Sequence, residues 1–147
     1  MPATPDISKP ETVLAFDFGL RRIGVAVGQS VCGSASPLGV ARNTGDGPDH
    51  AVIAAYVTEW QPNRLVVGMP AHADGSPSDI HDQVMAFIEE LERYQLPVAT
   101  VDERHTSVEA EAVLKNARAA GTRGRISKEM IDSAAAVFIA ERYLGSL

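Results

Sequence analysis

The segment Leu65–Val67 constrains the fold of this chain more than any other feature of its sequence. Its three residues are all aliphatic, and Gly68 ends the run at once. A strand that is polar on neither face has to be covered on both faces, which is typical of interior strands in sheets that carry helices on each side. We therefore expect this segment inside a sheet that has helices packed over it.

Other segments supply the rest of such a sheet. Five short segments have the alternation or the apolar content of strands: Val13–Phe18, Ile23–Val27, Ala35–Ala41 (the weakest), Leu65–Val67 and Val98–Val101. The first three follow one another after short connections, which predicts an antiparallel meander. The last two are separated by a helical pattern, as parallel strands are.

Four segments have helical periodicity between starting and terminating residues. They run from Pro48 to before Pro62, from a Ser76 cap to before Leu96, from a Thr106 cap to about Ala117, and from a Ser127 cap to near Gly145. Hairpin strands followed by strand and helix alternation predict an α/β fold. Its mixed five-stranded sheet combines a three-stranded antiparallel meander with two parallel strands and is flanked by helices.

The length of 147 residues fits one domain. Residues 1–11 contain three prolines and few apolar side chains, so we expect a flexible tail there and a single domain over residues 12–147. We expect neither a secretion signal nor a membrane-spanning helix, because no apolar run is long enough. A single cysteine, Cys32, forms no internal disulfide and favours a cytoplasmic location.

The charge of the chain is unevenly distributed. The net charge of -6 argues against nonspecific coating of nucleic acid, which depends on Lys and Arg. Five of the 13 basic residues lie between Lys115 and Lys128 without an acid among them, which leaves eight basic residues against 19 acidic ones elsewhere. The chain is thus an acidic body with one basic segment.

Three acidic positions are candidates for chemistry. Asp17 shares a strand face with Val13 and Ala15, so it extends an apolar row, where a carboxylate needs a cation or hydrogen-bond donors. A turn-capping role is the alternative for this residue. Asp102 and Glu103 follow a strand and point to opposite faces, and we favour Glu103 as the inward one.

The third position lies on the last predicted helix. Asp132 precedes a buried stripe at helical spacing, and the small residues Ser133–Ala136 allow this helix to approach a sheet closely. Three carboxylates from separate elements could then converge. Hard divalent cations take oxygen ligands, and two such ions can assist phosphodiester hydrolysis. Salt bridges remain the competing explanation for each acid taken singly.

Four blocks of the sequence resemble the YqgF family, which is also called RuvX. The blocks are Asp17–Val27, Val67–Pro70 with Gly75 and Ser76, Asp102–Ser107 and Ile131–Ala135, in this order. The family is similar in fold to RNase H and the RuvC resolvases, so the resemblance implies an RNase H-like nuclease domain. It further implies processing of the 5′ end of pre-16S rRNA in ribosome biogenesis, or resolution of Holliday junctions, as activities.

The resemblance also implies roles for individual residues. Asp17, Glu103 and Asp132 match the acidic active-site positions, which are expected to bind Mg²⁺ or Mn²⁺ and to activate water. Basic residues near these blocks could contact phosphate in precursor rRNA or branched DNA: Arg21, Arg22, Arg104, Arg123, Arg125 and Lys128. Ordinary surface charge is the alternative for each of them.

Three other questions stay open at this point. The chain could be a noncatalytic RNA-binding factor in ribosome assembly, although such a factor would have no need of three buried acids. An actin-like kinase or ATPase would need two such domains, and 147 residues supply one. The oligomeric state could be monomer or homodimer, and a two-fold junction substrate would favour the dimer.

Overall fold

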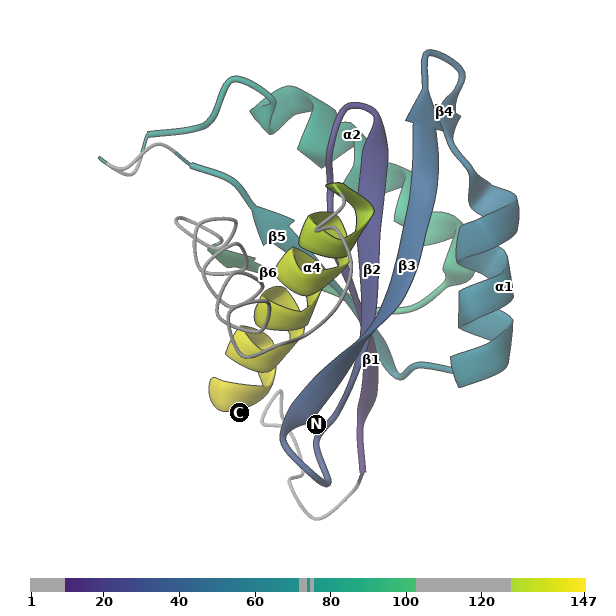
Figure 1. Cartoon of the computed structure of the whole chain (residues 1–147), viewed down its shortest axis with the longest axis vertical. Coiled ribbons are helices and arrows are strands. Elements are labelled where there is room, and N and C mark those ends of the chain that lie inside the picture. The colour runs from purple at the N-terminus through teal and green to yellow at the C-terminus, as the bar shows by residue number, and fades with distance from the viewer. Residues whose placement is uncertain (1–9, 72–73, 75, 103–127) are drawn as a thin grey trace, which may run out of the picture.

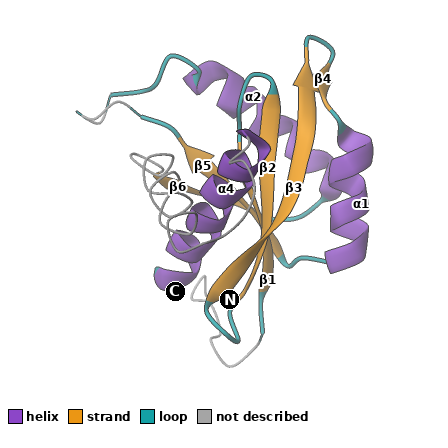
Figure 2. Cartoon of the chain, viewed as in Figure 1, coloured by secondary structure: helices purple, strands orange, loops and turns teal. Residues whose placement is uncertain are grey.

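The computed structural model describes residues 10–71, 74, 76–102 and 128–147. The strands are β1 (Thr12–Asp17), β2 (Arg22–Gln29), β3 (Ser34–Thr44), β4 (Gly47–Pro48), β5 (Arg64–Met69) and β6 (Val98–Asp102). The helices are α1 (His50–Trp60), α2 (His81–Leu91), the short 3₁₀ helix η1 (Glu92–Tyr94) and α4 (Lys128–Gly145), as Figures 1 and 2 show. None of these helices, within the part of the chain just given, is long and apolar enough to cross a membrane.

The six strands form one mixed sheet in the order β4-β3-β2-β1-β5-β6. β1, β2 and β3 pair antiparallel, and β5 pairs parallel to both β1 and β6. The predicted meander and the two predicted parallel strands are therefore confirmed. The difference is β4, a two-residue strand that pairs with the end of β3 and makes the sheet six-stranded instead of five-stranded.

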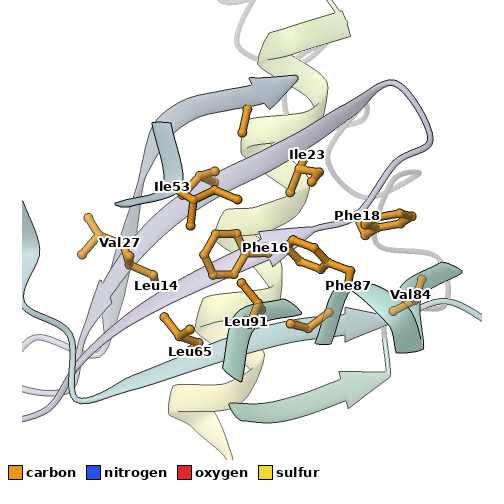
Figure 3. Close-up of a cluster of buried hydrophobic side chains, with 13 residues drawn as sticks. Leu14, Phe16, Phe18, Ile23, Val27, Ile53, Leu65, Val84, Phe87 and Leu91 are labelled. Carbon is orange, nitrogen blue, oxygen red and sulfur yellow. The ribbon is translucent and has the colours of Figure 1, made fainter. Parts of the chain in front are cut away.

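Helices cover both faces of the sheet, and the two faces of β1 pack into two separate cores. Leu14, Phe16 and Phe18 belong to the core beneath α1 and α2, where the rings of Phe16 and Phe87 meet edge to face at 5.7 Å (Figure 3). Val13 and Ala15 belong to the other core, beneath α4. The predicted period of two along this strand is confirmed, and it assigns Asp17 to the α4 face.

Two helices begin later than the sequence pattern predicts. α1 begins at His50 instead of Pro48, because Pro48 pairs in β4 and the carboxylate of Asp49 caps the helix by accepting from two backbone N–H groups. α2 begins at His81, far beyond Ser76. The side chain and the backbone N–H of Ser76 both donate to Asp74, so this serine closes a local turn and does not cap a helix.

β3 contains a bulge that glycine makes possible. The register with β2 shifts between Gly39 and Pro37, which leaves Leu38 as the extra residue. Gly39 has φ of 149°, and a Cβ there would lie 2.9 Å from the Tyr56 hydroxyl. That hydroxyl donates to the carbonyl oxygen of Leu38 at 3.2 Å. α1 therefore fixes the bulge from one side of the sheet.

His50, at the start of α1, lies in a partly buried polar cluster. Its Nδ1 is 2.7 Å from the Tyr94 hydroxyl, and its Nε2 is 3.8 Å from Glu90. Burial lowers the pKa of His50, and the charge of Arg93 acts in the same direction, whereas Glu90 and Asp49 oppose the shift. The imidazole is therefore neutral at pH 7.

Glu11 anchors the start of β1, at the end of the sheet that is opposite to Asp17. Its carboxylate accepts from Arg64 Nε at 3.0 Å and from the Tyr143 hydroxyl at 3.1 Å. Its backbone N–H donates to the Ser30 side chain at 2.8 Å. Residues 1–9 of the predicted tail lie outside the described residues, while Glu11 itself contacts three other elements or loops of the domain.

Candidate functional site

Asp17 ends β1 on the face that α4 covers. Its cross-strand partner on β2 is Gly24, which belongs to the same face. The side chain of Asp17 is half-buried at the end of the sheet where β1 has its carboxyl terminus. β5, the neighbour of β1 in the sheet, runs parallel to it, so the carboxyl ends of both strands lie at the same end of the sheet.

α4 brings Asp132 to the same place because β2 presents glycine to it. A Cβ on Gly24 would lie 2.0 Å from the backbone oxygen of Asp132 and 3.1 Å from the nitrogen of Ser133. The buried hydroxyl of Ser133 donates to the carbonyl oxygen of Gly39 at 2.9 Å, which ties the helix to the β3 bulge. Because Gly24 faces both Asp17 and Asp132, the two acids share one side of the sheet end.

The predicted buried stripe of α4 is confirmed, and the stripe is less buried at its first residue than further along the helix. Ala135, Ala136, Ile139 and Tyr143 are buried, as their spacing indicated, while Asp132 at the start of the stripe is half-buried. The small side chains explain the close approach of the helix backbone to the sheet. A carboxylate at this position is thus held by a packed helix and still reaches solvent.

Arg22 forms an ion pair with Asp132. Its Nε lies 2.9 Å from Oδ2, across 110 positions of sequence. The resemblance to the family predicts that Arg22 contacts phosphate. In the structure Arg22 lies against Asp132, the candidate metal ligand. Arg21, the neighbouring residue, is exposed. The loop between β1 and β2, which carries Arg21, is fixed by Asn43, whose side chain donates to the carbonyl oxygen of Gly19 at 2.8 Å.

The end of β6 separates the two acids that followed it in sequence. Ala99 and Val101 pack beneath α4, so Thr100 and Asp102 belong to the opposite face. There they line a cavity of about 270 Å³ together with His81 of α2. The side chain of Arg142 on α4 donates to the backbone oxygen of Asp102. Asp102 therefore does not share the face of Asp17.

The remaining predicted residues are not placed by this structure. Glu103, Arg104, Arg123 and Arg125, and the predicted helix over 106–117, lie outside the described residues. Lys128 is the first residue of α4, but its side chain is not described. In the part of the chain that is described, no three His, Cys, Asp or Glu side chains gather around a point that could hold a metal ion.

The donor chemistry of the two described acids nevertheless fits a hard cation. Asp17 and Asp132 offer carboxylate oxygens from two rigid elements, which is the donor type that Mg²⁺ and Mn²⁺ take. Gly24 and the Ser133–Gly39 pair, which position the start of α4 on the sheet, were not predicted from the sequence. A signal for the first was present, because Gly24, Ala26 and Gly28 make one face of β2 consist of small residues.

An antiparallel meander joined to two parallel strands, with a final helix that carries an aspartate to the end of β1, defines an RNase H-like resolvase fold. The chain superimposes on RuvC of T. thermophilus in complex with a Holliday junction substrate (TM-score 0.57, 13% identity, 92% of this chain and 94% of that one). It also superimposes on the Fowlpox virus resolvase bound to Holliday junction DNA (TM-score 0.56, 11% identity, 92% and 97%). At such identities these likenesses concern the fold alone.

Sequence similarity identifies the family. The model of the RuvX family, described as Holliday junction resolvase, matches residues 11–146, and the chain belongs to this family. A relative from Burkholderia lata, named "Putative pre-16S rRNA nuclease", is 44% identical over 141 residues, which are 95% of this chain and 93% of that protein. A relative from Dechloromonas aromatica with the same name is 43% identical over 136 residues, 92% and 91% of the two chains.

Proposed function

We propose that this protein is a divalent-metal-dependent endonuclease that hydrolyses phosphodiester bonds in structured nucleic acid. Its proposed substrate is the 5′ end of pre-16S rRNA, which makes ribosome biogenesis in the cytoplasm its setting. The observation that supports the proposal is that Asp17 and Asp132 lie on the same face at one end of the sheet, both next to Gly24. The names of the relatives at 43% to 44% identity support the choice of substrate.

The proposal assigns the cation to Asp17, Asp132 and Glu103. Asp102 belongs to the α2 face, opposite to Asp17. Glu103 lies outside the described residues and is kept as the third ligand because it matches an acidic position in the blocks of sequence that resemble the family. A bound Mg²⁺ or Mn²⁺ would stabilise the negative charge that develops on the phosphate and would lower the pKa of an attacking water.

The chain's own residues have a second task, which is to attract a polyanion to an acidic protein. The net charge of -6 repels phosphate, so binding has to depend on local positive charge. Arg21 is exposed on the loop that follows β1, four positions after Asp17. In the proposal Arg21 contacts backbone phosphates, as do Arg104 and, from the basic segment, Arg123, Arg125 and Lys128.

The experiment is a cleavage assay on a labelled pre-16S rRNA fragment with Mg²⁺, Mn²⁺ or chelator. The variant is Asp17→Asn, and the matched control is Asp46→Asn, an exposed aspartate in the turn between β3 and β4. We expect metal-dependent cutting that Asp17→Asn abolishes and Asp46→Asn retains. If the wild type binds the RNA but does not cut it with either metal, the chain is instead a noncatalytic RNA-binding factor.

Resolution of Holliday junctions is the second candidate, and the description of the matching family favours it. The same assay on a four-way DNA junction separates the two substrates. Paired, symmetric cuts in the junction with no cleavage of the RNA would replace rRNA processing by junction resolution. Sizing with and without the junction then tests for the homodimer that a two-fold substrate favours.

A further inference from the structure

The ion pair between Arg22 and Asp132 carries an inference about how the site is organised. Arg22 begins β2 and Asp132 lies in the first turns of α4, so the pair joins the sheet to the last helix. Their side chains are 31% and 25% exposed, which is too buried for a surface pair and too open for a core one. Both groups can therefore hold each other and meet a ligand from solvent.

The contact uses only part of the guanidinium. Arg22 donates through Nε to Oδ2 of Asp132 at 2.9 Å. An arginine has five N–H donors, so four remain on the two terminal nitrogens. Among the residues that the structure describes, those nitrogens have no hydrogen-bond partner. Arginine is suited to phosphate because these donors match two oxygens of the phosphate group at once.

The contact also uses only part of the carboxylate. Oδ2 of Asp132 accepts from Arg22, while Oδ1 has no hydrogen-bond partner within the described ranges. A carboxylate held through one oxygen has a defined orientation and presents the other oxygen in a fixed direction. Such an acid can bind a cation without first losing rotamer entropy.

We propose that Arg22 is a positioning residue that holds Asp132 through Nε and offers its terminal nitrogens to a phosphate of the substrate. One side chain then links the metal-binding acid to the nucleic acid. This inference rests on the proposed function, because it takes Asp132 as a cation ligand and a phosphodiester as the substrate. It differs from a plain phosphate contact because a positive charge at position 22, without the geometry of the guanidinium, would not maintain Mn²⁺ binding and cleavage.

Lysine is the informative substitution, and Arg42 is the matched control. A lysine keeps the charge but has a single ammonium group, which can meet Asp132 or the phosphate but does not reproduce the two-sided geometry. Arg42 lies directly across from Arg22 on β3 and has the same charge, yet it forms no ion pair with Asp132 among the described residues. If the loss of a positive charge in this region were the cause of a defect, Arg22→Gln and Arg42→Gln would show the same defect.

The test measures three quantities for Arg22→Lys, Arg22→Gln and Arg42→Gln. RNA binding in chelator over a range of salt gives the number of phosphate contacts without metal or turnover. We expect the slope of log K against log salt to fall by about one for Arg22→Gln and to persist in Arg22→Lys and Arg42→Gln. Mn²⁺ titration without RNA should show binding about threefold to tenfold weaker in Arg22→Lys, because Asp132 is no longer oriented.

Steady-state cleavage completes the comparison. We expect kcat/KM to fall about tenfold to hundredfold in Arg22→Lys, and to stay within about twofold of the wild type in Arg42→Gln. Full recovery of Mn²⁺ binding and kcat/KM by lysine would overturn the inference, since charge alone would then suffice. An unchanged salt slope in Arg22→Gln, or an equal loss in Arg42→Gln, would overturn it as well.

Two further outcomes keep this inference apart from the proposed function. If the wild type neither binds Mn²⁺ nor cuts RNA, the proposed function fails and this inference fails with it. If the wild type does both and lysine at position 22 behaves as arginine does, only this inference fails. Thermal unfolding in chelator checks the fold of each variant, and the charge-preserving Arg22→Lys decides the matter if Arg22→Gln does not fold.

Discussion

Replacing Gly24 by alanine is the sharpest test of how α4 is placed on the sheet. The added Cβ would lie 2.0 Å from the backbone oxygen of Asp132 and 2.4 Å from its carbonyl carbon, whereas real Cβ contacts essentially never fall below 3.0 Å. The obstructing atoms are helix backbone, so no side-chain rotation relieves the clash. The start of α4 has to move away from β2 by about 1 Å or more.

The energetic cost follows from what that movement disturbs. Overpacking of this kind costs about 1 to 3 kcal/mol. The hydrogen bond from Ser133 to Gly39 is 2.9 Å long and would be stretched beyond bonding distance, which adds about 1 kcal/mol. We therefore expect Gly24→Ala to lower the free energy of unfolding by about 2 to 4 kcal/mol, equivalent to a fall in Tm of about 5 to 15 °C for a domain of this size.

Urea unfolding followed by circular dichroism measures this loss, and Gly28→Ala is the control. The atoms nearest to a Cβ on Gly28 would belong to the side chains of Leu144, Ala140 and Val13, at 3.2 to 3.3 Å, and not to a backbone. These neighbours would have to shift by only a few tenths of an ångström, so we expect a smaller loss of about 1 kcal/mol there. If Gly24→Ala unfolds within about 0.5 kcal/mol of the wild type, or loses no more than Gly28→Ala, the close approach of α4 to β2 is refuted. Displacing Asp132 by 1 Å should also reduce cleavage about 100-fold.

Three further predictions concern single contacts. Ser133→Ala leaves the partly buried carbonyl of Gly39 without the serine donor and should lower the free energy of unfolding in urea by about 1 to 2 kcal/mol; a loss within experimental error would contradict the role of this bond. Because the pKa of His50 is lowered in the folded protein, the unfolded chain takes up a proton first, so stability should decline as the pH falls below about 6.5. His50→Gln should flatten this part of the pH–Tm profile, and an unchanged slope would refute the assignment. Glu11→Ala removes the acceptor of Arg64 and should lower the free energy of unfolding by about 1 to 2 kcal/mol at low salt, whereas a wild-type value would show that the pair is fully screened.

Prediction from the sequence succeeded where the pattern of apolar residues directly reflects which side chains are buried. The alternation of Val13–Phe18 predicted which face Asp17 shares, because a strand between two cores cannot change its period. The aliphatic run Leu65–Val67 predicted an interior strand, and β5 lies between β1 and β6. The stripe that starts at Asp132 predicted the buried face of α4, because helical spacing and packing agree there.

Residue preferences failed as predictors where a particular hydrogen bond or strand pairing decided the structure. Pro48 is well suited to the first turn of a helix, but pairing with the end of β3 draws it into a strand. Ser76 is a common capping residue, but Asp74 binds it in a turn. The pairing of Arg22 with Asp132 spans 110 positions, and no periodicity within either segment indicates it.

The position of α4 in the chain has a consequence for the protein during its synthesis. α4 follows all the described strands in sequence, yet it supplies Asp132, which lies at the same end of the sheet as Asp17 and next to Gly24. A nascent chain emerging from the ribosome can pair β1, β2 and β3 through contacts that are near in sequence, whereas α4 must close over them from about a hundred residues away, which is slow. A growing chain thus lacks Asp132 at the proposed site for most of its translation, and the proposed nuclease activity would begin only after α4 has folded onto the sheet.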